Sequence, residues 1–197
     1  MGTRPSPCIL DIGSPSISIS LGNRPLDPTQ LTLGIPFLAG ATITQREPNT
    51  LSCIVDRGGQ VKLSFFGLPD IPRLRPPLIA PDNGLRIASL LDLAGMKASV
   101  VQMRAEAKDY IDMDAMLADW RIDLPIALAA ARAIHGAAFN PQITLKALGY
   151  FGETSLRNLP ADVKARLIRA VRAVDLDRLP DIAAAGASPD NDRGPPP

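Results

Sequence analysis

Lys97, Asp109 and Asp112 are the residues of this sequence whose types and spacing could do chemistry. At helical spacing Lys97 shares a face with mostly apolar residues, where a helix packed on a core usually carries another apolar side chain. A lysine there either extends its ammonium group to solvent or points it into a polar cleft against an anion such as a nucleotide phosphate. The other residues of this predicted face are Leu90, Leu93, Ala94, Val100, Val101 and Arg104.

Asp109 and Asp112 are three positions apart, so on a helix their carboxylates share a face. In that place they could orient Lys97 or help to hold a metal ion. The alternative is a solvated acidic face, on which Lys108 and Asp112 form an exposed pair of little energetic worth. The residues alone leave both interpretations open, for the two aspartates as for Lys97.

Other residue types that often carry chemistry are few. His135 directly precedes Gly136 at the end of an alanine-rich segment. An interaction with the helix dipole explains a histidine there, and the sequence nominates no partner for it as a base. Cys8 and Cys53 are expected to be ordinary thiols, and one histidine without a Cys-x-x-Cys motif disfavours a zinc site.

The composition is that of a soluble globular protein, with 197 residues, 46% apolar residues and a net charge of +1. This charge gives no general attraction to nucleic acid, and the few aromatic residues disfavour a stacking platform for single strands. No apolar run reaches the roughly 18 residues of a membrane span, and the N-terminus lacks the pattern of a signal peptide. We therefore expect a cytoplasmic protein with no membrane partner.

The first part of the chain reads as mostly β-structure. Residues 50–55 and 61–66 are β-rich and flank Asp56-Arg57-Gly58-Gly59, which predicts a hairpin. Residues 16–21 alternate in polarity and predict a strand, and Asp27 is placed to cap a short helix that starts at Pro28. Two further short strands are expected around residues 41–44 and 85–88.

From Ser89 onward the sequence predicts helices. Ser89 and Asp92 form a near capping box for a helix that runs to about Glu106. Later helices are expected at 108–119, 123–135, 140–151 and 159–174. The prediction is therefore an α+β chain with a mostly β part at 1–88, a helical part at 89–180 and a disordered tail at 181–197.

Two motifs carry a resemblance to a known family. Residues 89–97 read Ser-Leu-Leu-Asp-Leu-Ala-Gly-Met-Lys, and residues 108–113 read Lys-Asp-Tyr-Ile-Asp-Met. At this separation they resemble the Asp-Leu-Ala-x-x-Lys and Lys-Asp-Phe/Tyr-x-Asp-Leu motifs of the AbiEii/AbiGii family of nucleotidyltransferase toxins. Residues 24–28, 61–66 and 139–151 are similar to the same family, so that the resemblance spans about residues 24–175.

The resemblance implies a polymerase-β-like nucleotidyltransferase core, with a short mixed sheet, followed by a helical bundle. It implies transfer of a nucleotide from an NTP with Mg²⁺, and as partners an acceptor such as tRNA and an antitoxin protein. Carried over by motif, Lys97 is the nucleotide-binding residue, and Asp109 and Asp112 form the acidic motif that we take as catalytic.

The sequence also departs from the family pattern. Where the family has an Asp-x-Asp pair on a strand, residues 16–21 read Ser-Ile-Ser-Ile-Ser-Leu, and a third family carboxylate falls near Ser64. Two-metal phosphoryl chemistry needs anionic oxygens. The chain is therefore interpreted as an N-terminally truncated or degenerate member, incomplete in its core, with impaired transfer and doubtful Mg²⁺ binding. The alternatives are a non-catalytic remnant that binds a nucleotide or an antitoxin, and a plain α+β domain.

Overall fold

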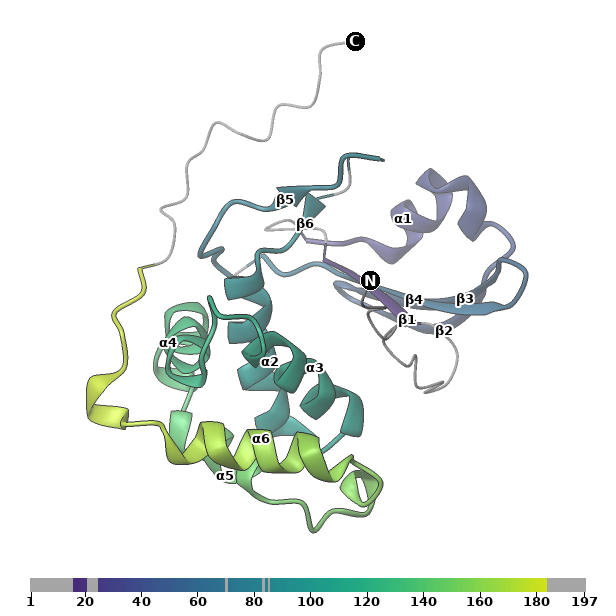
Figure 1. The fold of residues 1–197 in the computed structure, drawn as a ribbon. Coiled ribbons are helices and arrows are strands. Elements are labelled where there is room, and N and C mark those ends of the chain that lie inside the picture. Colours follow the sequence, from purple (N-terminus) through teal and green to yellow (C-terminus); the bar gives the residue numbers. More distant parts are fainter. Residues whose placement is uncertain (1–15, 21–24, 70, 83, 85, 184–197) are drawn as a thin grey trace, which may run out of the picture. The chain divides into compact units, whose positions relative to one another are not determined.

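The computed structural model describes residues 16–20, 25–69, 71–82, 84 and 86–183 (Figure 1). It is a mixed α+β structure, as the sequence predicts. The chain divides into two compact units, residues 1–70 and residues 71–197. The sequence placed the change from β to helical structure at residue 88, whereas the proline-rich connection from residue 71 clusters with the helices.

Unit 1 is built on a four-stranded mixed sheet in the order β1-β4-β3-β2. Strand β1 runs parallel to β4, and β2, β3 and β4 are antiparallel neighbours. The bounds are β1 (Ser16–Ser20), β2 (Thr42–Glu47), β3 (Thr50–Asp56) and β4 (Gln60–Phe66). The predicted hairpin at 50–66 is confirmed, and the predicted strand at 16–21 is confirmed to within one residue.

Local side-chain chemistry sets the turns of unit 1. Asp56 Oδ1 accepts from the backbone N–H groups of Gly58 and Gly59, and Gly58 has a φ of 76°, which a residue without Cβ adopts at no cost. Helix α1 (Pro28–Gly34) begins as predicted, since Asp27 Oδ1 accepts from the N–H of Thr29 at 2.8 Å.

The core of unit 1 lies on one face of its sheet. Alternate residues of β3 and β4 pack there, and α1 and the following 3-10 turn (Pro36–Leu38) cover them. Cys53 is fully buried in this core, and burial raises the pKa of its thiol. Cys8 lies outside the described residues. The buried members are Leu26, Leu38, Leu51, Cys53, Val55, Leu63 and Phe65.

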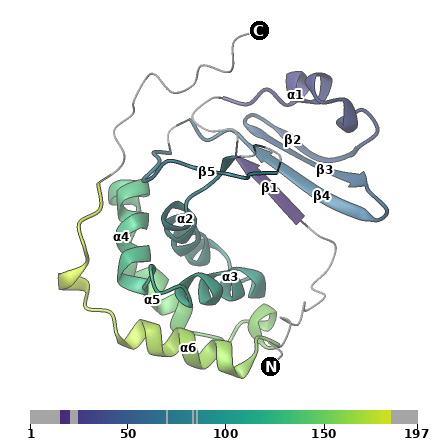
Figure 2. The ribbon, with the colours of Figure 1, turned by 45° about the horizontal axis from the view of Figure 1, so that its top comes forward.

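Unit 2 begins with a short hairpin and continues as a helical bundle. The bounds are β5 (Leu78–Ile79), β6 (Arg86–Ile87), α2 (Leu90–Met103), α3 (Ala107–Leu117), α4 (Leu124–His135), α5 (Pro141–Gly149) and α6 (Ala161–Arg172). Figures 1 and 2 show α2 lying between α3 and α4. Ser89 caps α2 as predicted, and Asp123 and Asn140 each accept a backbone N–H at the start of α4 and α5.

Small residues let α2 and α4 approach closely. A Cβ atom at Gly95 would lie only 2.9 Å from the carbonyl carbon of Ala130 and from Ile134 Cδ1. The buried side of α2 therefore holds Ala94, Gly95, Ala98 and Val101. The predicted apolar face of α2 was wrong for Leu93, which is 41% exposed, whereas Ala94 and Val101 of that face are buried.

Helices α2 and α5 both end earlier than predicted. Helix α2 stops at Met103 rather than near Glu106, because Arg104 is extended, with φ −152° and ψ 143°. Helix α5 ends at Gly149, so that Phe151 packs from a loop, edge-on to Tyr110 with 6.1 Å between ring centroids. The described start of the predicted tail is packed, since Ile182 lies against the cluster of Leu74, Ala130 and Ile134.

Asp92 ties the proline-rich connection to α2. Its carboxylate is buried and accepts the N–H of Leu74 at 2.7 Å and the N–H of Arg75 at 3.3 Å. Ser89 Oγ also contacts this carboxylate. Within the described residues, no helix is both long enough and apolar enough to cross a membrane.

Candidate functional site

The predicted site residues come together between α2 and α3. Lys97 Nζ on α2 donates to Asp109 Oδ1 at 2.9 Å and to Asp112 Oδ2 at 2.8 Å, both on α3. The interpretation in which Asp109 and Asp112 orient Lys97 thus matches the geometry. Lys97 does not point freely into solvent, since 22% of its side chain is exposed.

Asp109 is the buried centre of this cluster. Its side chain is 0% exposed, and both oxygens are engaged, Oδ1 by Lys97 and Oδ2 by Arg104 Nε at 2.8 Å. Burial alone raises the pKa of this carboxyl, but the hydrogen bonds from Arg104 and Lys97 outweigh it and hold the pKa below its ordinary value. Asp109 therefore stays ionised and holds α2 to α3.

Asp112 is the accessible carboxylate of the pair. Its side chain is 53% exposed, and it meets Lys97 at the surface. Hydrogen bonds to Asp112 and Asp109 raise the pKa of Lys97 although burial opposes them, so the ammonium form persists. The Lys97–Asp112 pair thus consists of a partly exposed cation and an accessible anion.

The neighbouring charges pair differently from the sequence expectation. Lys108 was expected to pair with Asp112 in the solvated alternative, but it lies 3.2 Å from Glu106. Glu106 also lies 3.5 Å from Arg104 Nη1. With three cations and three anions, the formal charges of the cluster cancel; its members are Lys97, Arg104, Glu106, Lys108, Asp109 and Asp112.

Asp114 is not a free surface charge. Its side chain is 13% exposed and receives three hydrogen bonds from Arg166 on α6, the shortest at 2.7 Å. Arg166 also reaches Asp162 one turn away on its own helix at 2.9 Å. This clamp joins α3 to α6, and sequence reasoning could not find it because the partners are 52 positions apart.

His135 ends α4, as predicted. It is half-buried, its Nε2 atom makes no hydrogen bond, and burial lowers the pKa of the imidazole. Interaction with the helix dipole requires the charged form, which burial disfavours. Among the described residues, no set of three histidine, cysteine or acidic side chains is grouped to hold a metal ion.

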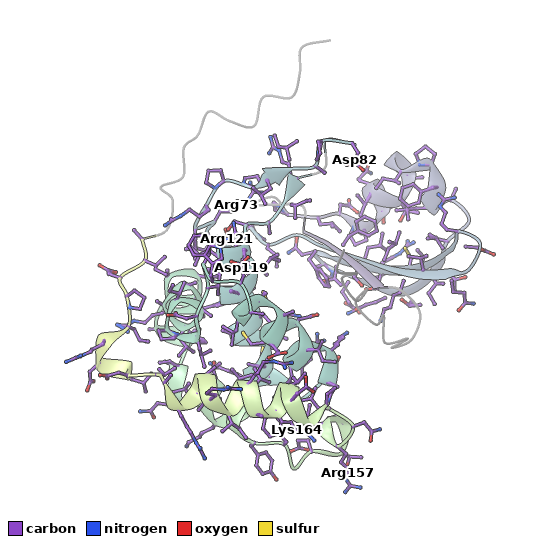
Figure 3. All side chains as sticks on the ribbon, in the orientation of Figure 1. Arg73, Asp82, Asp119, Arg121, Arg157 and Lys164 are labelled. Atoms are coloured by element: carbon purple, nitrogen blue, oxygen red, sulfur yellow. The ribbon has the colours of Figure 1, made fainter. Side chains whose placement is uncertain are left out.

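Trp120 is a surface feature that sequence reasoning missed. It stands on the turn between α3 and α4 and is 92% exposed. Asp119 and Arg121 flank it and bind one another side by side, with Arg121 Nη2 2.8 Å from Asp119 Oδ2 (Figure 3). The sequence feature that indicates this surface is the Asp-x-Arg spacing around the chain's single tryptophan.

The resemblance to the AbiEii/AbiGii family rests on the sequence motifs alone. No family model, no curated protein and no solved structure matches this chain.

Proposed function

We propose that this chain is a nucleotidyltransferase of the AbiEii/AbiGii toxin type that binds an NTP at Lys97 and is impaired in nucleotide transfer. The observation that carries the proposal is the Lys97–Asp112 pair, which the packing of α2 on α3 presents at the surface with a contact of 2.8 Å. An ammonium group held there can exchange its exposed carboxylate partner for a phosphate oxygen.

The mixed sheet of unit 1 supports the proposed descent. Its strand β1 runs parallel to β4 beside an antiparallel hairpin, which is compatible with a polymerase-β-like core of few strands. The family resemblance implies transfer from the NTP to a nucleic acid, for which tRNA is the acceptor to test, in a toxin–antitoxin or phage-defence setting.

The residues of the sheet do not fit the Mg²⁺ ions of that reaction. In the Cα register Ser18 lies opposite Ser64, and Ser64 lies opposite Ser52, with Ser52 Oγ and Ser64 Oγ 3.1 Å apart. Serine residues occupy these register positions, whereas two-metal chemistry needs carboxylates. The proposal therefore assigns NTP binding to Lys97 and assigns no catalytic step to unit 1.

A second candidate, a binding-only protein that recognises a nucleotide or an antitoxin, is favoured by the state of Asp109. Both oxygens of Asp109 are engaged by Lys97 and Arg104 and its side chain is 0% exposed, so it is not accessible to a substrate proton or metal. Asp109 then acts as a positioning residue, and Asp112 is the carboxylate of the motif that a ligand reaches.

The test compares NTP binding and NTP transfer in the full chain. Labelled ATP, CTP, GTP and UTP are titrated with and without Mg²⁺, and transfer to tRNA is measured separately. We expect saturable binding with little transfer, and a loss of binding in Lys97→Ala but not in Lys108→Ala, which removes an exposed lysine of the same cluster that pairs with Glu106. Robust transfer that survives Lys97→Ala would overturn the site assignment. Transfer that Lys97→Ala abolishes would instead exclude the binding-only alternative.

A further inference from the structure

Strand β1 lies at one edge of the unit 1 sheet. The strand order is β1-β4-β3-β2, so among the described strands β1 pairs with β4 alone, and Figure 2 shows it at the outer side of the sheet. In an edge strand, alternate residues direct their backbone N–H and C=O groups away from the sheet. These groups are a template on which a further strand can pair.

The opposite edge of the sheet, strand β2, is protected against such pairing. Its register shifts between Ile43 and Gln45, and a bulge of this kind interrupts the row of hydrogen-bonding groups. It ends in Arg46 and Glu47, which are charged and exposed. Bulges and charges are devices by which natural sheets block pairing at an edge. Strand β1 has neither, since Ser16–Ser20 is uncharged and pairs with β4 without a register shift.

The sequence of β1 is the same in both directions. It reads Ser-Ile-Ser-Ile-Ser, with Ser18 at its centre. A twofold axis through Ser18 therefore brings two copies of β1 together as antiparallel strands in which serine meets serine and isoleucine meets isoleucine. Ile17 of one copy is then opposite Ile19 of the other.

The same axis continues the rows of the sheet from one copy into the other. The two isoleucines of β1 pair in the Cα register with the core residues Leu63 and Phe65, and Ser18 pairs with Ser64. Across the axis, the apolar rows of one copy meet the apolar rows of the other, and the serine rows also meet. A slip of one residue would set apolar rows beside serine rows, so the alternation specifies this register.

We propose that a second copy of this chain pairs with the first, β1 against β1, and joins the two four-stranded sheets into one. About four to six backbone hydrogen bonds connect the copies, depending on which residues of β1 direct their groups outward. The protected β2 strands form both ends of the joined sheet, so assembly stops at a dimer. This proposal goes beyond the proposed function and does not involve Lys97.

Sedimentation equilibrium of the full chain measures the association. Two paired five-residue strands make a small interface, so we expect a dimer that dissociates on dilution. The mass should rise with concentration toward twice that of one chain and should not exceed it. A chain that stays monomeric up to millimolar concentration, or that assembles beyond the dimer, would overturn the proposal.

Charged variants at the axis locate the contact. Ser18→Lys and Ser18→Glu each place two like charges directly opposite one another, which opposes pairing. We expect each variant alone to be monomeric where the wild type is dimeric, and an equimolar mixture of the two to dimerise. Thr44→Lys adds the same charge to the β2 edge and is the matched control, with unchanged association. A dimer that both Ser18 variants retain, or a mixture that stays monomeric, would refute the β1 interface.

Cysteine cross-linking tests the register with smaller substitutions. Cys8→Ser is made in every variant, and Cys53 is fully buried. Directly opposed residues of antiparallel strands have Cα atoms about 4.5–5.5 Å apart, so Ser18→Cys should form a disulfide-linked dimer on oxidation. Ser16→Cys and Ser20→Cys should cross-link when mixed and not when alone. Cross-linking of Ser16→Cys with itself, or none in Ser18→Cys, would contradict the antiparallel pairing.

Discussion

Replacement of Asp109 by asparagine is expected to destabilise unit 2 strongly. The carboxylate is 0% exposed and accepts from Lys97 Nζ at 2.9 Å and from Arg104 Nε at 2.8 Å. Removing one partner of a buried ion pair costs about 3–5 kcal/mol, because the other charge is left uncompensated. Lys97 and Arg104 are partly exposed and regain some hydration, so the cost expected for Asp109→Asn is about 2–4 kcal/mol.

Asp112→Asn is the matched control for this prediction. It makes the same chemical change on the same helix and removes the same lysine's other partner. Because Asp112 is 53% exposed, its ion pair is hydrated and is worth at most about 1 kcal/mol. The two variants should therefore differ by about 1–4 kcal/mol.

Urea unfolding followed by far-ultraviolet circular dichroism measures both variants. Apart from α1, all the α-helices in the described residues belong to unit 2, so this signal reports mainly on unit 2. An Asp109→Asn variant as stable as Asp112→Asn would refute the assignment of Asp109 as the bond between α2 and α3.

The same pair gives a pH dependence with a definite sign. The pKa of Asp109 is below its ordinary value of 3.8, because hydrogen bonds from Arg104 and Lys97 outweigh the opposing effect of burial. Its stabilisation is therefore complete above that value and is lost as the pH falls through the folded-state pKa. We expect the wild type to lose stability below about pH 4, and Asp109→Asn to lose less over the same range.

Three further substitutions test the packing and the turns. Gly95→Ala should destabilise unit 2 by about 1–3 kcal/mol through the close approach to α4, whereas Gly149→Ala, with open space around it, should be neutral in the same urea titration. Asn49 has a φ of 61° and accepts the Leu26 N–H, so Asn49→Ala should lower the free energy of unfolding by about 1 kcal/mol more than Asn49→Gly. Asp92→Ala should speed hydrogen exchange at the Leu74 amide, and unchanged protection there would contradict the role of Asp92.

The sequence predicts the element order well because the signals for it are local. A cap such as Asp27 or Asp123 acts on N–H groups two or three residues away, and the turn at Gly58 needs a positive φ at one position. Such signals require no knowledge of the rest of the fold. They account for the helix starts and for the β3–β4 hairpin.

The parts that sequence reasoning missed depend on partners distant in the chain. The buried side of α2 is set by Ala130 and Ile134 of α4, which accept only small residues opposite them, so Leu93 turns outward. The two-residue strand β5 lies within a proline-rich stretch and carries no alternating pattern long enough to notice, whereas its partner β6 falls inside the strand predicted at 85–88. The candidate site was found because Lys97, Asp109 and Asp112 belong to adjacent helices, whose spacing the sequence does encode.

A variant of Asp112 can distinguish a motif that is retained for folding from a motif that binds a ligand. Asp109 holds α2 to α3, so a variant at this position changes the stability of unit 2 whether or not the site binds a ligand. Asp112→Asn spares the fold and removes one negative charge next to Lys97. If Lys97 binds phosphate directly, Asp112 competes with the ligand, and this variant should bind metal-free ATP several-fold more tightly than wild type. Weaker metal-free binding in Asp112→Asn would show that the carboxylate itself contacts the nucleotide, and equal binding would place the phosphate away from Lys97.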